Sequence, residues 1–230
     1  MCTNTSWGGK EVEADSKTVV LNKETIESVK FAVPLWKETM DEGGLAWDDT
    51  NNNRAFLSGS ISATNNGASI YIEAKRKPDS YLTETGRPMK DDILHAGIPA
   101  GPGGQFNLPG PFTDMLMNYS KNQKPAKDFM RWIRSKPVFD EWFTSQQGYT
   151  AGATKVWEEH PVWNLDPVLA PFKKIPVTGR LAGYAGPPSR QAAEVTTKYI
   201  IVDMYAKAIQ GMPAEDAVKA AHAELVKIYT

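Results

Sequence analysis

The sequence predicts a helix-rich α/β protein, and three features of its 230 residues support this fold class. Several long segments place apolar residues at steps of three and four, which is the spacing of one face of a helix. Two short segments, 60–64 and 92–98, have the composition of strands. Clusters of glycine and proline separate these elements and mark the loops between them.

The first long helix is expected over residues 23–40. Its apolar residues form one stripe at helical spacing: Ile26, Val29, Val33, Trp36 and Met40. Asn22 can cap the N-terminus by accepting a bond from a free backbone N–H. Pro34 removes one backbone donor and can kink the helix, and Gly43-Gly44 ends it.

Short elements follow in the next sixty residues. They are, in order, a helix at 54–58, a strand at 60–64 that leads to Asn66-Gly67, a helix at 69–75 and a strand at 92–98. The basic run Lys75-Arg76-Lys77 stops at Pro78. We interpret this run as a solvated helix end, because it is too short for a nucleic-acid site.

Two glycine-rich breaks divide the second half of the chain. GIPAGPGGQFNLPGP, residues 97–111, marks a boundary or a crossing between lobes, and GYTAGAT, residues 148–154, is the second break. The elements around them are helices at 125–135 and 137–147, a mostly irregular stretch at 155–188, a helix at 189–210 capped by Ser189, and a last helix at 213–229.

Bulk composition excludes several classes of protein. The net charge of −1 provides no strong field that would attract nucleic acid or an anionic membrane. The single cysteine, Cys2, cannot form an intramolecular disulfide, which fits the cytoplasm and also the many periplasmic proteins without disulfides. No apolar run approaches the ~20 residues of a membrane span, and the first residues do not read as a signal peptide.

The stretch AWDDTNNNRAF, residues 46–56, concentrates oxygen ligands and could be a calcium loop. Asp49 would be its first ligand, but the sixth position is Arg54, where the turn needs glycine, and the twelfth is Ser60, where a bidentate glutamate is needed. We therefore interpret the stretch as the cap of a short helix. Trp47 and Asp48 precede that cap and remain candidates for ligand contact.

No catalytic constellation is apparent, so we expect no enzyme activity, no metal and no cofactor. The three histidines lie far apart in sequence and lack the spacing of zinc ligands. The turn at 101–104 lacks the lysine of a phosphate-binding loop and opens no helix. A glycan hydrolase would need two carboxylates that face one cleft, whereas Asp48 and Asp49 are neighbours that point apart.

Aromatic residues are unusually frequent in the expected loops. Trp7, Trp47, Tyr149, Trp163 and Tyr184 all lie beside glycine, proline or polar clusters. An aromatic face can stack on the C–H face of a sugar ring, although packing is the commoner role of any single aromatic residue. As a group, these residues favour a polar, ring-shaped ligand.

The order of segments resembles family 1 extracellular solute-binding proteins, the sugar receptors of ABC importers, a family that includes the maltose-binding proteins. The matching segments are ETIESVKFAVPLWKETMDEG, AFLSG at 55–59, NGAS at 66–69, GIPAGPGG, SKNQKPAKDFMRWIRSKPVFDEWF at 120–143 and AIQGMPAEDAVKAAHAEL at 208–225. No single motif is diagnostic, but the ordered set covers nearly the whole chain.

The resemblance implies a periplasmic-binding-protein-like (type II) fold, of which this chain is mostly the C-terminal lobe with an incomplete N-terminal lobe. Family members are longer, so we expect a truncated product, a fragment or a misplaced start. Residues 1–100 would be the first part of the C-terminal lobe, 101–154 the hinge crossings with a helical portion of the N-terminal lobe, and 155–230 the closing part. The helices at 125–146 would then expose an apolar face.

The implied function is to bind a sugar, oligosaccharide or polyol in a hinged cleft in the periplasm and to deliver it to an ABC permease, without binding nucleic acid or inserting into the membrane. The residues expected to line the cleft are Trp47, Asp48, Asn66, Gly67, Gly103, Gly104, Tyr149, Tyr184 and Arg190. The alternative is a stand-alone helical protein-interaction domain with no small-molecule ligand.

Overall fold

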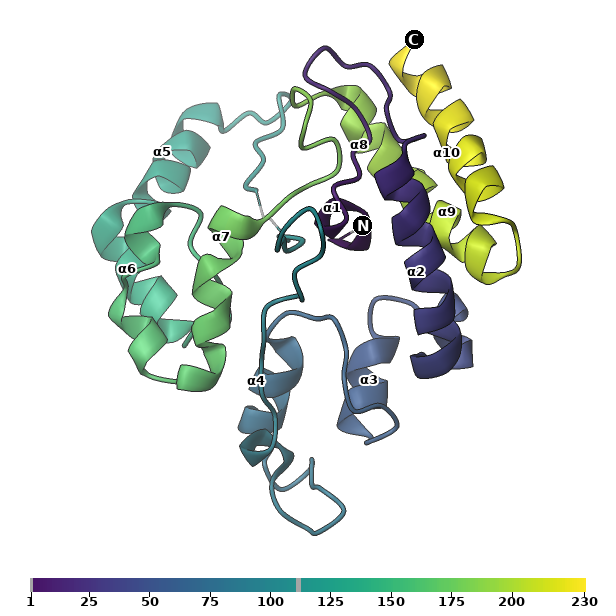
Figure 1. The fold of residues 1–230 in the computed structure, drawn as a ribbon. Helices are drawn as coiled ribbons and strands as arrows, with labels where there is room; N and C mark the ends of the chain where they lie inside the picture. Colours follow the sequence, from purple (N-terminus) through teal and green to yellow (C-terminus); the bar gives the residue numbers. More distant parts are fainter. Residues whose placement is uncertain (1, 111–112) are drawn as a thin grey trace. The chain divides into compact units, whose positions relative to one another are not determined.

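The computed structural model describes residues 2–110 and 113–230, which form two compact units. Unit 1 consists of Met1–Ala55, Gly97–Leu108 and Thr178–Thr230, and unit 2 of Phe56–Ala96 and Pro109–Val177. The chain therefore passes between the units four times. Figure 1 draws the helices of both units. The assignment of 1–100, 101–154 and 155–230 to particular lobes stays a prediction.

Among the described residues, unit 1 contains five α-helices. They are α1 (Cys2–Ser6), α2 (Lys23–Thr39), α8 (Arg190–Thr197), α9 (Ile200–Ile209) and α10 (Ala214–Tyr229), with the 3-10 helix η1 (Glu42–Ala46) after α2. Four of them, α2, α8, α9 and α10, contribute side chains to one apolar core. α2 packs against both α9 and α10, which lie side by side in Figure 1. Fully buried Val29, Ile201, Met204, Val218 and Leu225 form the centre of this core.

The prediction for α2 is confirmed at its start. Asn22 accepts a bond from the Thr25 backbone N–H at 2.7 Å, which satisfies one of the free donors of the first turn. Pro34 lies inside the helix, and the helix ends at Thr39, with Met40 as its C-cap residue and Gly43 beyond it. Only the N-terminal part of the apolar stripe is well packed, since Val29 is fully buried and Met40 is exposed.

The prediction of one continuous helix at 189–210 is wrong. α8 ends at Thr197 and α9 begins at Ile200, because Tyr199 between them has a φ of 55°. A left-handed residue cannot continue a right-handed helix. The Ser189 cap is confirmed, since its Oγ accepts a bond from the Ala192 N–H at 3.1 Å.

Unit 2 consists of shorter elements. They are α4 (Ser69–Arg76), η2 (Met89–Asp91), α5 (Gln123–Ile133), α6 (Lys136–Ser145), η3 (Lys155–Trp157), η4 (Pro161–Asn164), η5 (Pro167–Lys174) and α7 (Ile175–Thr178), whose last residue belongs to unit 1. α3 (Asn51–Leu57) spans the first passage between the units. The expected irregular stretch at 155–188 is thus partly helical. One cluster of buried apolar residues packs α4 against η5, and a second is centred on Phe143.

Both predicted strands are wrong. Residues 60–64 and 92–98 form turns, bends and loops. The only β-type pairings among the described residues are isolated bridges. A short extended segment needs a neighbouring strand to satisfy its backbone groups, and neither segment has one. The second segment is held by side chains instead, since Arg87 binds the Asp92 carboxylate at 2.7 and 2.8 Å and Ile93 is buried.

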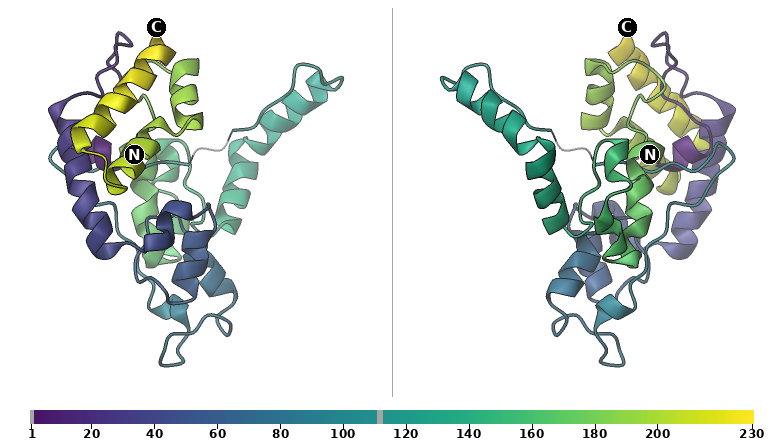
Figure 2. Two further views of the ribbon diagram at one scale, coloured as in Figure 1. Left: turned by 90° about the vertical axis from the view of Figure 1, so that its right-hand side faces the viewer. Right: turned by 90° about the vertical axis from the view of Figure 1, so that its left-hand side faces the viewer.

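α5 buries none of its residues. Phe129 is 56% exposed and Trp132 is 57% exposed, and their rings lie 5.7 Å apart. Figure 2 shows α5 beyond α6, away from α4 in the same unit. Among the residues that the structure describes, no helix combines the length and the apolar character that a membrane span requires.

Candidate functional site

Three of the predicted site residues gather around a tight glycine turn in unit 1. Gly101 and Gly104 exchange backbone hydrogen bonds at 3.0 Å, and the Gly103 N–H donates to the Ser6 carbonyl at 2.7 Å. A Cβ on Gly103 would lie 2.4 Å from the Gly8 nitrogen, so only glycine allows this approach. The glycines thus have a packing role, whatever else they contact.

An arginine and two aromatic rings lie next to this turn. A Cβ on Gly104 would lie 3.1 Å from the Phe106 ring. The Arg180 guanidinium lies over the Phe106 ring at 4.8 Å and over the Tyr184 ring at 5.8 Å. The Arg180 backbone N–H donates to the Asn107 carbonyl at 2.9 Å, which fixes the two segments side by side. Gly103, Gly104 and Tyr184 are therefore linked through Phe106 and Arg180, two residues that the sequence did not single out.

A buried carboxylate supports the turn that carries Tyr184. Glu11 is 7% exposed and accepts a hydrogen bond from the Gly183 N–H. Burial raises the pKa of Glu11, although the bond from Gly183 acts in the opposite direction. Gly183 itself has a φ of 67°, and its contact with Ala192 leaves little room for a side chain.

Asp48 closes the turn before α3. Its Oδ1 accepts bonds from the Thr50 backbone N–H at 2.8 Å and the Thr50 hydroxyl at 2.7 Å, and the Asn51 side chain accepts a bond from the Asp48 N–H. The bonds from Thr50 hold the pKa of Asp48 below its usual value, with a smaller effect from Arg54. This arrangement confirms that the stretch serves a helix start. In the described part of the chain, no group of three or more acidic, histidine or cysteine side chains could hold a metal ion.

The remaining predicted residues are spread more widely. Trp47 follows η1 in unit 1, and Arg190 is the exposed first residue of α8 in the same unit. Asn66, Gly67 and Tyr149 belong to unit 2. Unit 1 therefore holds six of the nine predicted residues and unit 2 holds three, and their role in ligand binding stays a prediction.

In unit 2, Asn66 and Gly67 form the approach to α4. The Asn66 amide donates to the Ser69 hydroxyl at 3.2 Å, and Ser69 is the first residue of that helix. A Cβ on Gly67 would meet no atom within 4 Å, so its surface is open. Tyr149 is 49% exposed and follows Gly148, whose φ of 87° requires glycine.

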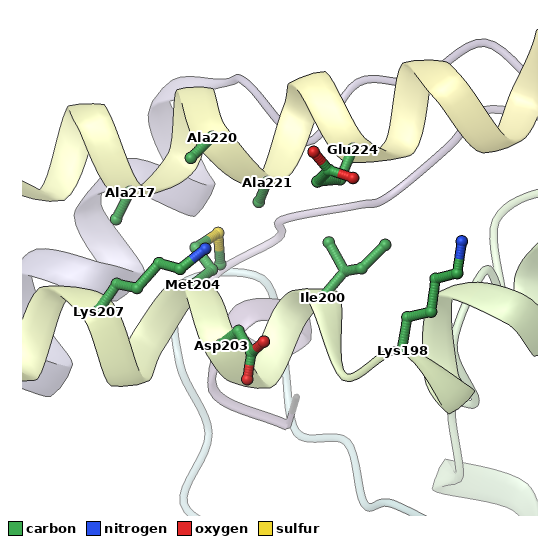
Figure 3. Close-up of a pocket in the computed structure, with 9 residues that line it drawn as sticks. All are labelled: Lys198, Ile200, Asp203, Met204, Lys207, Ala217, Ala220, Ala221 and Glu224. Atoms are coloured by element: carbon green, nitrogen blue, oxygen red, sulfur yellow. The ribbon is translucent and has the colours of Figure 1, made fainter.

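A hollow in unit 1 is lined by other residues. Its volume is about 310 Å³, and it lies between α9 and α10. Figure 3 shows Lys198, Asp203, Lys207 and Glu224 among the residues that line it, together with apolar side chains. None of the nine predicted residues lines it. This hollow is the seam between two packed helices, and it does not coincide with the predicted site.

The sequence of the chain matches a known family of binding proteins. A sequence profile of the bacterial extracellular solute-binding proteins matches residues 3–171, and the chain belongs to that family. This confirms the predicted resemblance.

A solved structure, "Maltose bound T. maritima MalE3", resembles the chain with a TM-score of 0.74 and 18% identity. The likeness covers 98% of this chain and 56% of that protein, and it confirms the periplasmic-binding-protein-like fold class. The chain thus spans about half the length of this relative. No curated protein matches the sequence.

Proposed function

We propose that this chain is a ligand-binding part of an ABC-type importer and binds a sugar, oligosaccharide or polyol. The observation that carries the proposal is the family match over residues 3–171. The likeness to a maltose-bound protein supports a carbohydrate as the ligand class. The family is one of transport components, which agrees with the lack of a catalytic constellation in the sequence.

The proposed contacts follow from residue type and exposure. Trp47 and Tyr184 would stack on the sugar ring, while Asp48 and Asn66 would bind hydroxyl groups. One Asp48 oxygen holds the turn before α3, so its other oxygen would face the ligand. The Arg180 guanidinium lies over the Tyr184 ring and donates from Nη1 to the Gly179 carbonyl at 2.9 Å, so it would hold the Tyr184 ring in place.

The proposed mechanism is binding without chemistry. In a hinged receptor, the ligand contacts both lobes only in the closed state, so it favours closure by its differential affinity. The closed receptor would then deliver the ligand to the permease subunits from the periplasm. GIPAGPGG at 97–104 and GYTAGAT at 148–154 are the segments where we expect such a hinge to bend.

A binding screen with the purified chain tests the proposal. Maltose, trehalose, glucose and glycerol would be titrated by calorimetry, and a hit would be repeated with Trp47→Ala and Asn66→Ala. We expect each variant to weaken binding by about tenfold, which is the loss of about 1.4 kcal/mol. Unchanged affinity in both variants would remove these residues from the site. Lys219→Ala in α10 is a control that is expected to bind normally.

An exposed apolar face on the helices at 125–146 is what the resemblance to the receptors predicts, and it also fits the second candidate, a helical protein-interaction domain. The exposed ring pair of Phe129 and Trp132 on α5 is the kind of surface that proteins cover in a complex. This candidate predicts that no carbohydrate of the screen binds and that a partner protects α5. Carbohydrate binding that depends on Trp47 or Asn66 would exclude it as the main function.

A further inference from the structure

A buried polar network ties α4 to η5 within unit 2. The Tyr71 hydroxyl donates to Asp166 Oδ2 at 2.8 Å, and the Lys75 ammonium donates to the same oxygen at 2.7 Å. Asp166 Oδ1 accepts the Val168 backbone N–H at 3.2 Å, which caps the start of η5. Asp166 is only 8% exposed, so these bonds replace water around a buried carboxylate.

His95 completes the network from a third segment. Its Nδ1 lies 3.1 Å from the Val168 carbonyl, which can only accept, so Nδ1 carries the hydrogen and Nε2 is the basic nitrogen. The His95 ring meets the Tyr71 ring at 5.6 Å and the Phe172 ring at 4.8 Å, both edge to face. The imidazole is therefore packed between α4 and η5.

The network reaches the predicted ligand residues through α4. Tyr71 and Lys75 lie on this eight-residue helix, and Ser69 at its start binds the Asn66 amide. Since the buried face of α4 packs against η5, loss of this packing would free the helix and the Asn66-Gly67 turn before it. We define the α4 latch as Tyr71, Lys75, His95, Asp166 and Val168.

We propose that the α4 latch is a pH-sensitive device: a proton on Nε2 of His95 opens it and loosens the Asn66-Gly67 turn. The effect on ligand rests on the proposed function, but the opening of the latch does not. The geometry gives the reason, because the proton would place a charge between two aromatic rings in a half-buried position.

The charged groups around His95 determine the direction of the effect. Burial lowers the pKa of His95, and the Val168 carbonyl and the Asp166 carboxylate only partly oppose this. Burial would raise the pKa of Asp166, but the bonds from Lys75 and Tyr71 outweigh it and lower the value, so Asp166 stays ionised. Burial and the bond to Asp166 raise the pKa of Tyr71 to about 12, with a small contribution from Asp91, so this hydroxyl stays neutral.

The sign of the pH dependence follows from these shifts. His95 binds its proton more weakly in the closed latch than in the open one. Below about pH 6.5 the open form therefore gains protons first, and the latch loses stability as the pH falls. Each unit of pKa difference shifts the equilibrium between closed and open forms by about tenfold.

Hydrogen exchange measured by mass spectrometry on the whole chain tests the latch. We expect amides of Ser69–Arg76 and Pro167–Lys174 to lose about threefold or more of their protection between about pH 7.5 and about pH 5.5, after correction for intrinsic rates. His95→Gln keeps a donor for the Val168 carbonyl but cannot take the proton, so it should abolish this change. His222→Gln in α10 is the matched control and should keep it.

Two results would overturn the proposal. The first is equal protection at both pH values in the unmodified chain, and the second is the same pH dependence in His95→Gln. If His95→Gln does not fold, the nuclear magnetic resonance titration of His95 in the unmodified chain decides the question. A pKa at or above about 6.5 would then exclude the latch. None of these measurements uses a carbohydrate, so failure of the latch and failure of sugar binding are distinguishable.

Discussion

The buried carboxylate of Glu11 supports the turn that carries Tyr184, and its protonation should change the stability of unit 1. Burial raises its pKa in the folded chain, so the folded state binds the proton more tightly than the unfolded state does. The stabilisation is fully present below the unfolded pKa of about 4.5 and is lost as the pH rises through the folded value.

We therefore expect Glu11→Gln to gain stability relative to the unmodified chain as the pH rises above about 4.5. The glutamine oxygen can still accept the Gly183 N–H, but it carries no charge. Urea denaturation followed by circular dichroism at several pH values measures the difference. The control is Glu13→Gln, whose exposed pair with Lys10 contributes little. A difference that does not change with pH would contradict the prediction.

Two glycines of the predicted site should respond differently to alanine. In Gly103→Ala the new Cβ would lie 2.4 Å from the Gly8 nitrogen and 2.6 Å from its Cα, so we expect a loss of about 1–3 kcal/mol. Gly67→Ala has open space and should stay within about 0.5 kcal/mol. Thermal unfolding measures both. Equal effects would show that the glycine turn is not as tightly packed as its distances imply.

At the scale of the elements, the sequence predicts helices well and the segments between them poorly. The helices α2, α4, α5, α6 and α10 begin and end within about two residues of the expected positions, which is the ordinary margin for helix ends. Apolar spacing and local caps, such as Asn22, define them. The two strand predictions failed because strand-like composition is only a local signal, whereas a strand also needs a partner strand elsewhere in the chain.

The break between α8 and α9 could not be predicted from the local sequence pattern either. Tyr199 is 63% exposed and has a φ of 55°, a conformation that costs most residues energy. Asparagine tolerates it better, so Tyr199→Asn should stabilise unit 1 by up to about 1 kcal/mol. Chemical denaturation measures the change. Lys207→Asn inside α9 is the control and should cost about 0.5 kcal/mol. Destabilisation by Tyr199→Asn would show that the tyrosine ring packs more than its exposure suggests.

At the scale of the whole molecule, the sequence predicts the family and fold but not the composition of the site. The ordered set of segments was sufficient to identify the family, although no single motif is diagnostic. The site required contacts between distant segments. Phe106 and Arg180 lie 74 positions apart (180 minus 106), and nothing in their local sequence indicates that the guanidinium covers the ring at 4.8 Å. Glu11, buried against Gly183, was missed for the same reason.

The exposed face of α5 gives the last prediction, which concerns the behaviour of the chain in solution. Phe129 and Trp132 are more than half exposed, and α5 buries no residue. Clustered aromatic rings in water bind apolar dyes and promote association. We expect the purified chain to enhance the fluorescence of anilinonaphthalene sulfonate and to associate as its concentration rises in sedimentation velocity.

Replacing both rings should remove most of this behaviour, because it removes the apolar surface without disturbing a buried contact. Phe129→Ser with Trp132→Ser tests this, and Leu94→Ser is the control, since Leu94 is an 83% exposed apolar side chain in the same unit that carries no aromatic ring. If the double variant keeps the dye signal and the association of the unmodified chain, the α5 face is not the surface responsible. If both are lost only in the double variant, α5 is the surface on which a covering polypeptide should be sought.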